Sequence, residues 1–242
     1  MTLTIVVPCF NEDDRLDMNQ FRLLLELVPE IDLLFIDDGS TDNTLKVLRD
    51  FAGTEPSRVS TLSLPANNGK AEAVRIGLLF AITEGSSWTA YVDADLATPV
   101  DEIRRLWLIC QQSLSTEIVF GSRVRLCGSG IHRHWTRHLV GRIFAFLASR
   151  TLGTYVHDTQ AGVKFVKSTP ALNRALATPF CNRWSFDVEL LARLGRLGIF
   201  PDRALEVPLH VWHDVPGSKV SLGQGIAAAL SLWKVRRRLQ SP

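Results

Sequence analysis

The sequence of 242 residues has few cysteines and no long hydrophobic run, and each absence excludes a class of protein. Its four cysteines, Cys9, Cys110, Cys127 and Cys181, are scattered, and none belongs to a C-x-x-C pair. This spacing argues against a disulfide framework or a cysteine-based metal site, and it predicts reduced thiols in a cytosolic protein. The apolar segment 4–8 is too short for a secretory signal. Because no apolar run approaches the roughly 18 residues of a membrane span, contact with a membrane is expected only at its surface.

Strong positive charge and the common nucleotide-binding motifs are also missing. The formal net charge is +2, from 27 Lys and Arg against 25 Asp and Glu, which disfavours a general nucleic-acid-binding protein. No G-x-G-x-x-G follows the first predicted strand, so a dinucleotide-binding dehydrogenase is disfavoured. No G-x-x-x-x-G-K-[ST] is present, which disfavours a P-loop NTPase. Hydrophobic residues make up 46% of the chain, enough for the core of one large domain.

The chain does contain short apolar segments that alternate with amphipathic ones. Strands are predicted at 3–7, 31–36, 59–64, 88–92, 117–121, 163–166 and 204–212. Helices are predicted at 17–27, 42–51, 70–81, 100–112, 131–150, 185–197 and 221–239. This alternation predicts βαβ units, and so an α/β, Rossmann-like fold with a mostly parallel central sheet flanked by helices. Ligands of such sheets bind beyond the carboxyl ends of the strands, where we expect the site.

Two carboxylates, Asp93 and Asp95, follow the apolar strand 88–92. On an extended backbone the i, i+2 spacing places both side chains on one side, where they repel each other unless a cation lies between them. Mg²⁺ or Mn²⁺, bound by these oxygens and by those of a diphosphate, meets that need. A solvated loop with incidental acids is the alternative.

Other strands are followed by polar residues of the same kind, among them Glu12, Asp37, Asp38, Lys70 and Arg123. Lys70 opens a predicted helix and is suited to meet diphosphate charge as a point cation, although a solvated lysine would look the same. The acids could equally serve turns or helix dipoles. A helix N-cap is expected at position 41 or 42.

Six motifs in a fixed order carry a resemblance to a known family. They are Val7-Pro8-Cys9-Phe10-Asn11-Glu12, Asp37-Asp38-Gly39-Ser40-Thr41-Asp42, Asn68-Gly69-Lys70, Asp93-Ala94-Asp95, Gly121-Ser122-Arg123 and the helix start at Asp187. In this order they resemble the family-2 inverting glycosyltransferases of the GT-A fold. Residues 158–164, 183–187 and 217–219 are most similar to the polyprenyl-phosphate sugar transferases, and 93–99 to the dolichyl-phosphate glucose synthase branch. The mannose synthase branch usually has Gln where Ala97 stands and Arg where His213 stands, so the third metal contact stays open.

The resemblance implies one GT-A domain over 1–242, with a C-terminal extension on the acceptor side. Residues 1–125 would bind the nucleotide sugar, 126–220 the acceptor, and 221–242 would form a basic amphipathic helix. The implied reaction is metal-dependent, inverting transfer of a hexose to a polyprenyl phosphate, from UDP-glucose or, second, GDP-mannose. Two alternatives remain open: transfer to a soluble sugar or glycan with a carboxylate general base, and a non-catalytic nucleotide-sugar-binding partner subunit.

The resemblance also implies residue roles. The nucleotide-sugar site would comprise Pro8, Phe10, Glu12, Asp38, Lys70, Asp93 and Ala94. The catalytic carboxylates would be Asp93 and Asp95, which hold the metal, together with Asp158 and Asp187, which orient sugar hydroxyls or arginines. The acceptor phosphate would meet Arg123, Arg133, Arg137, His213 and Lys219. A monophosphate, with a second pKa near ~6, is already a nucleophile at pH 7, so it needs cations rather than a base.

The expected partners are a nucleotide sugar, a polyprenyl phosphate lipid, a membrane surface and a possible membrane-anchoring subunit, without nucleic acid. The expected location is cytoplasmic, peripheral on the cytosolic face of a membrane. The predicted helices 131–150 and 221–239 combine an apolar face with basic edges, so each could lie on an anionic membrane or pack against the core.

Overall fold

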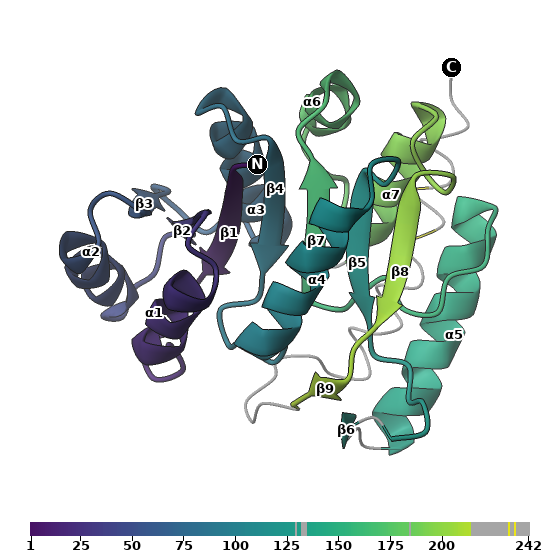
Figure 1. Cartoon of the computed structure of the whole chain (residues 1–242), viewed down its shortest axis with the longest axis horizontal. Coiled ribbons are helices and arrows are strands. Elements are labelled where there is room, and N and C mark those ends of the chain that lie inside the picture. The colour runs from purple at the N-terminus through teal and green to yellow at the C-terminus, as the bar shows by residue number, and fades with distance from the viewer. Residues whose placement is uncertain (129, 132–134, 184, 214–231, 233–234, 236–242) are drawn as a thin grey trace.

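The computed structural model describes residues 1–128, 130–131, 135–183, 185–213, 232 and 235, with the backbone alone for 135–140. In this part of the chain a seven-stranded sheet has the order β3-β2-β1-β4-β7-β5-β8 (Figure 1). The strands are β1 (Leu3–Cys9), β2 (Ile31–Asp37), β3 (Val59–Ser63), β4 (Trp88–Val92), β5 (Ile118–Ser122), β7 (Val163–Lys167) and β8 (Ala204–Pro208). Strand β7 runs antiparallel to β4 and β5, and the other neighbours are parallel. The predicted α/β fold with a mostly parallel sheet is therefore confirmed.

Helices cover both faces of the sheet (Figure 1). They are α1 (Met18–Leu27), α2 (Thr44–Thr54), α3 (Lys70–Thr83), α4 (Val100–Gln112), α5 (Trp135–Leu152), α6 (Pro170–Leu176) and α7 (Phe186–Arg196). Side chains alternate along β1, where Ile5 and Val7 pack in one apolar cluster with α1 and α4, and Val6 packs in the other with α3. Burial on both faces explains why the strands read as continuous apolar runs.

Several predicted boundaries were wrong. Strand β1 continues through Pro8 to Cys9, because its pairing with β2 extends beyond its pairing with β4. The N-cap of α2 is Asn43, while the Asp42 carboxylate accepts a hydrogen bond from the Thr44 N–H. Helix α5 begins at Trp135, after a short strand β6 (Gly130–Ile131).

The segment 204–212, predicted as one strand, is two. After β8, the chain leaves the main sheet, and β9 (Val211–Trp212) pairs with β6. Helix α6 was not predicted, although its start carries an N-cap signal: Thr169 accepts from the Leu172 N–H, and Pro170 follows. The predicted helix 221–239 lies outside the described residues except for 232 and 235. Among the helices described, none has the length and apolar character to cross a bilayer.

Candidate active site

The polar loops named from the sequence meet at one edge of the sheet. The arrowheads of β1, β4, β5 and β8 point to the lower edge in Figure 1, and β6 and β9 lie below that edge. The loop after β1 carries Glu12, the loop after β2 carries Asp38, and the loop after β4 carries Asp93. The prediction that the site follows the carboxyl ends of parallel strands therefore matches the arrangement of these loops.

The Asp93–Asp95 segment forms a turn, so the prediction of an extended backbone was wrong. The Leu96 N–H donates to the Asp93 carbonyl at 3.1 Å, and Leu96 has a left-handed φ of 45°. The two carboxylates nonetheless lie close enough to interact. Burial and then the charge of Asp93 raise the pKa of Asp95, although Arg15 and Lys70 act in the opposite direction.

Each of these two carboxylates holds a cation. The Lys70 ammonium, at the first residue of α3, lies 2.5 Å from an Asp93 oxygen. The Arg15 guanidinium lies 2.7 Å from an Asp95 oxygen and 3.1 Å from Glu12. Burial opposes the charge on Lys70, but the carboxylates around it, Asp93 foremost, outweigh that effect and raise its pKa. Arg15 was missed in the sequence, although it stands three residues after Glu12 in a loop already noted for its polar character.

Gly162, the residue before β7, lies against the Asp93 carboxylate. The Asp93 N–H donates to the Gly162 carbonyl at 3.0 Å. A Cβ at residue 162 would lie 2.2 Å from an Asp93 carboxylate oxygen, so the backbone here approaches the carboxylate as closely as only glycine permits.

Asp38 anchors the loop that presents Lys70. Its carboxylate, 2% exposed, accepts hydrogen bonds from the Asn68 N–H at 2.8 Å and the Gly69 N–H at 2.7 Å. Burial raises the pKa of Asp38, against the effect of these two donors. Both oxygens of Asp38 therefore accept hydrogen bonds from the loop before α3, and its contact with the nucleoside stays a prediction.

The remaining residues predicted for the donor lie at the same edge. Pro8 and Phe10 are half-buried, and Glu12 donates its backbone N–H to the Thr44 hydroxyl. The methyl group of Ala94 is buried in the core.

On the acceptor side, Asp158 holds Arg123 in a two-pronged ion pair. The Arg123 Nε and a terminal nitrogen donate to the two Asp158 oxygens at 2.6 and 2.9 Å, and the Arg123 backbone N–H donates at 3.1 Å. The guanidinium carbon also lies 5.4 Å from the centre of the Trp212 ring in β9. Of the two roles predicted for Asp158, this geometry matches the one in which it orients an arginine.

Asp187, in the first turn of α7, is held by side chains from strands β4 and β7. One oxygen forms an ion pair with the Lys164 ammonium, at 2.8 Å, and accepts a hydrogen bond from the Tyr91 hydroxyl. Lys164 was part of a quoted motif without a role, and Tyr91 was missed because its position inside an apolar strand predicts only packing. Together, the described residues place a cation against each of four carboxylates. The four pairs are Asp93–Lys70, Asp95–Arg15, Asp158–Arg123 and Asp187–Lys164.

The other predicted phosphate ligands are placed only in part. Arg133 and Lys219 lie outside the described residues, and only the backbone of Arg137 is described. His213 is exposed. Its backbone N–H donates to the Ala97 carbonyl at 2.9 Å, so its backbone lies beside the loop that carries Asp95.

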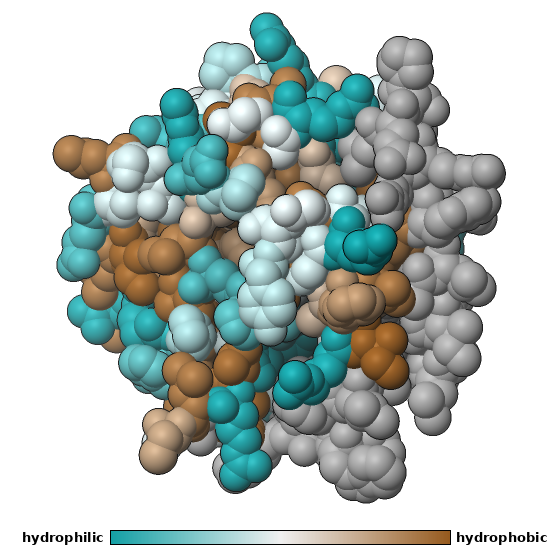
Figure 2. Space-filling model, turned by 90° about the vertical axis from the view of Figure 1, so that its right-hand side faces the viewer, coloured by the Kyte–Doolittle hydropathy of each residue, from teal (hydrophilic) through white to brown (hydrophobic). Residues whose placement is uncertain are grey.

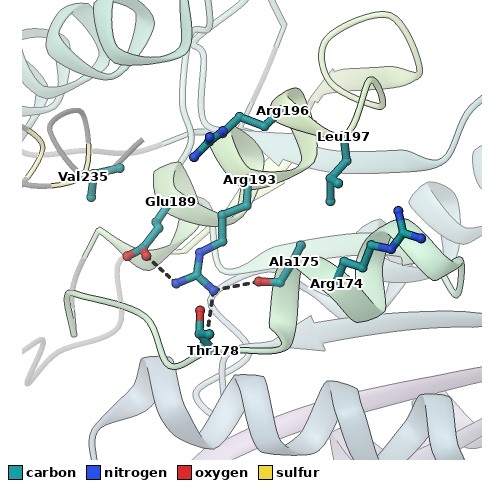
Figure 3. Close-up of a pocket in the computed structure, with 8 residues that line it drawn as sticks. All are labelled: Arg174, Ala175, Thr178, Glu189, Arg193, Arg196, Leu197 and Val235. Atoms are coloured by element: carbon teal, nitrogen blue, oxygen red, sulfur yellow. Dashed lines mark hydrogen bonds and ion pairs between the residues drawn. The ribbon is translucent and has the colours of Figure 1, made fainter. Parts of the chain in front are cut away.

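A separate open pocket of about 300 Å³ lies between α6, the last turns of α7 and Val235 (Figure 3). Arg193 crosses it, and its guanidinium donates to Glu189 and to the carbonyls of Ala175 and Thr178. The Arg174 and Arg196 guanidinium groups point in different directions (Figure 3). The pocket lies at the opposite end of α7 from Asp187, away from the four ion pairs.

The sequence of this chain also matches the model of a known protein family. Residues 4–171 match the model described as "Glycosyl transferase family 2". The chain belongs to this family. It is a glycosyltransferase, as the order of its motifs predicted, and its sheet and helices form the GT-A fold.

Curated relatives from distant organisms are similar over nearly the whole glycosyltransferase chain. A dolichyl-phosphate beta-glucosyltransferase of Dictyostelium discoideum is 29% identical over 98% of this chain and 74% of its own. One of Trichomonas vaginalis is 31% identical over 96% of this chain and 70% of its own. A polyprenol monophosphomannose synthase of Mycolicibacterium smegmatis is 24% identical over 97% of this chain and 88% of its own.

Among solved structures, the fold is similar to that of glucosyl-3-phosphoglycerate synthase from Mycobacterium tuberculosis. Its complex with Mn²⁺, UDP and phosphoglyceric acid gives a TM-score of 0.67 at 20% identity, over 100% of this chain and 79% of that one. Its complex with Mg²⁺ and UDP gives a TM-score of 0.64. At this identity the likeness concerns the fold alone.

Proposed function

We propose that this glycosyltransferase transfers a hexose, with inversion, from a nucleotide sugar to the phosphate of a polyprenyl lipid, and that it uses a divalent metal. The observation that carries the proposal is the pair Asp93 and Asp95 at the end of β4, each neutralised by a cation in the described structure. The names of the curated relatives support the polyprenyl phosphate, and UDP-glucose is the favoured donor, with GDP-mannose second.

The donor set fits Mg²⁺ or Mn²⁺. Asp93 and Asp95 offer hard oxygen ligands. The Lys70 ammonium and the Arg15 guanidinium contact these carboxylates, which indicates that positive charge is stabilised there. No cluster of three His, Cys, Asp or Glu side chains suited to a metal occurs in the described part of the chain, so diphosphate oxygens would complete the coordination. Bound there, the ion would supply positive charge that stabilises the leaving nucleotide. Lys70 and Arg15 would then leave the carboxylates and form ion pairs with the diphosphate.

The acceptor side favours a phosphate over a hydroxyl nucleophile. A hydroxyl acceptor needs a general base, and the two carboxylates considered for that task are both ion-paired, Asp158 with Arg123 and Asp187 with Lys164. A lipid monophosphate is already ionised at pH 7 and needs a positioned cation. Arg123, fixed by Asp158, is suited to that role, together with the predicted partners Arg133, Arg137, His213 and Lys219.

The outer face of α5 supports a peripheral position on a membrane, which we propose to be its cytosolic face. Phe144 and Ala148 pack into the core, whereas Ile143 and Phe146 are 54% and 66% exposed. The exposed Arg142 lies on the same helix, whose sequence contains no acidic residue. Hydrophobic and hydrophilic side chains are interspersed on the side of the molecule shown in Figure 2. An apolar face with basic neighbours suits an anionic lipid surface, near a polyprenyl acceptor.

The direct test is to incubate the purified chain with radiolabelled UDP-glucose or GDP-mannose, a polyprenyl phosphate, and Mg²⁺ or Mn²⁺. We expect label in the lipid extract with UDP-glucose, and its loss when Asp93→Asn removes one metal ligand without changing the side-chain shape. Absence of extractable label with either donor would refute the acceptor assignment. Label in a water-soluble glycan, lost in Asp158→Asn or Asp187→Asn while donor binding persists, would favour the hydroxyl-acceptor alternative. UDP binding without turnover would favour a non-catalytic subunit.

A further inference from the structure

Lys164 is a charged side chain in the centre of the sheet. It lies on β7, between β4 and β5, and is 0% exposed. Burying an ammonium costs several kcal/mol unless strong partners compensate, and apolar side chains often fill such positions at least as well. A buried cation in contact with a carboxylate of the candidate active site is therefore a candidate for a functional role.

The contacts of Lys164 converge on Asp187. The ammonium forms an ion pair with the Asp187 carboxylate at 2.8 Å and donates a hydrogen bond to the Ala161 carbonyl at 3.0 Å. It also lies 5.2 Å from the centre of the Tyr91 ring. Tyr91 and Lys164 are directly opposite each other in the antiparallel pairing of β4 with β7. The Tyr91 hydroxyl donates a hydrogen bond to the same Asp187 oxygen that pairs with the ammonium. Two adjacent strands thus fix one oxygen of Asp187.

The Asp187 charge also acts on the donor side of the site. Its side chain retains 9% exposure, and its charge contributes to the raised pKa of Lys70, the residue that contacts Asp93. Asp187 therefore contacts the buried Lys164 and also interacts electrostatically with Lys70, the cation predicted to meet the diphosphate.

We propose that Lys164 and Tyr91 are positioning residues, which hold Asp187 ionised and fixed so that it contacts the hexose of the nucleotide sugar. This inference rests on the proposed use of a nucleotide-sugar donor, but it does not depend on the acceptor. Lys164 acts through Asp187 and does not itself touch the substrate.

The electrostatics give the direction of a pH effect. Burial raises the pKa of Asp187 to about 7, and burial lowers that of Lys164 to about 7. An opposite charge at 2.8 Å favours the ionised form of each group. Lys164 is also influenced by Asp158, Lys70, Asp93 and Arg123, and Asp187 by Lys70. Without the Lys164 charge, the pKa of Asp187 rises further, so the carboxylate ionises only at higher pH.

The test compares Lys164→Met, Tyr91→Phe and Asp187→Asn with the unaltered chain, in titrations with UDP-glucose and with UDP in the presence of Mn²⁺. We expect Lys164→Met to weaken UDP-glucose binding at least about tenfold and to leave UDP binding within about twofold, because Asp187 contacts the sugar only. The ascending acid limb of kcat/KM should move to higher pH by about one unit in Lys164→Met. Tyr91→Phe removes a single hydroxyl, and should show the same selective loss even if Lys164→Met does not fold. Lys167→Met, at the end of the same strand, is the matched control.

A double-mutant cycle separates positioning from a general structural role. If Lys164 acts through Asp187, then Lys164→Met adds no further loss of UDP-glucose affinity in the Asp187→Asn background. Additive losses, or equal weakening of UDP and UDP-glucose, would overturn the inference while leaving the proposed function intact. Donor binding with the expected selectivity but without lipid labelling would overturn only the acceptor assignment. Failure of the unaltered chain to bind either UDP-glucose or GDP-mannose would overturn both.

Discussion

Replacing Gly162 by alanine tests whether the position of the Asp93 carboxylate governs catalysis. A Cβ at residue 162 would lie 2.2 Å from one Asp93 oxygen and 2.3 Å from its Cγ, whereas ordinary contacts begin at 3.4 Å. The carboxylate must therefore retreat by about 1 Å. Gly162 does not have a left-handed φ, so alanine introduces no backbone strain there.

The expected effect is on activity and not on stability. A displacement of about 1 Å in a positioned group can cost about 10²-fold, so we expect kcat/KM to fall about 100-fold, which is about 2.7 kcal/mol of transition-state stabilisation. The Asp93 side chain is 32% exposed and can rotate, so the free energy of unfolding should change by less than about 0.5 kcal/mol. The assay is lipid labelling from UDP-glucose at a series of Mn²⁺ concentrations, with the thermal unfolding midpoint measured in parallel.

The matched control is Gly53→Ala in α2, where a Cβ would meet nothing within 4 Å. Its activity should equal that of the unaltered chain. The reasoning fails if Gly162→Ala keeps normal kcat/KM and normal Mn²⁺ dependence. It also fails if the loss of activity is matched by a comparable loss of stability, because the effect would then not be local to the metal ligand.

Three further predictions concern other parts of the molecule. Arg58 donates to three backbone carbonyls at the end of α1 and the start of β2, so Arg58→Met should lower the free energy of unfolding by about 3 kcal/mol in chemical denaturation. Cys127 and Cys181 are exposed and should react with a thiol reagent in the native state, whereas burial raises the pKa of the other two cysteines and should protect them. Phe146→Glu should reduce sedimentation with anionic vesicles by at least about tenfold, because it places a charge on the exposed apolar face of α5.

Matched variants define what would contradict these predictions. Arg49→Met, on the exposed face of α2, should leave stability unchanged, and an equal loss in both arginine variants would show that the Arg58 bonds contribute little. Phe80→Glu changes a 40% exposed phenylalanine on α3. Equal vesicle binding by both phenylalanine variants would show that α5 is not the contact surface. Reaction of all four thiols in the native state would contradict the assigned burial of Cys9 and Cys110.

The sequence by itself determined the fold class and the main parts of the candidate site. Apolar strands alternating with amphipathic helices fixed a mostly parallel sheet, because each pattern suits only one kind of element. The acids that follow β4 and the lysine that opens α3 could be found because strand ends and helix starts are local signals. Those signals also predicted that Asp93 and Lys70 lie at the same edge of the sheet, whereas their contact is a feature of the tertiary structure.

Only the tertiary structure decided which charges meet. Arg15 and Asp95 are 80 residues apart, and their ion pair depends on the packing of one loop against another. Lys164 faces Tyr91 because β7 enters the sheet antiparallel, a register that neither strand reveals alone. Segment 204–212 divides because β9 pairs with β6 outside the main sheet. The physical reason is the same in each case: periodicity reports which side chains of one element are apolar, while the pairing of buried charges depends on neighbours far away in the chain.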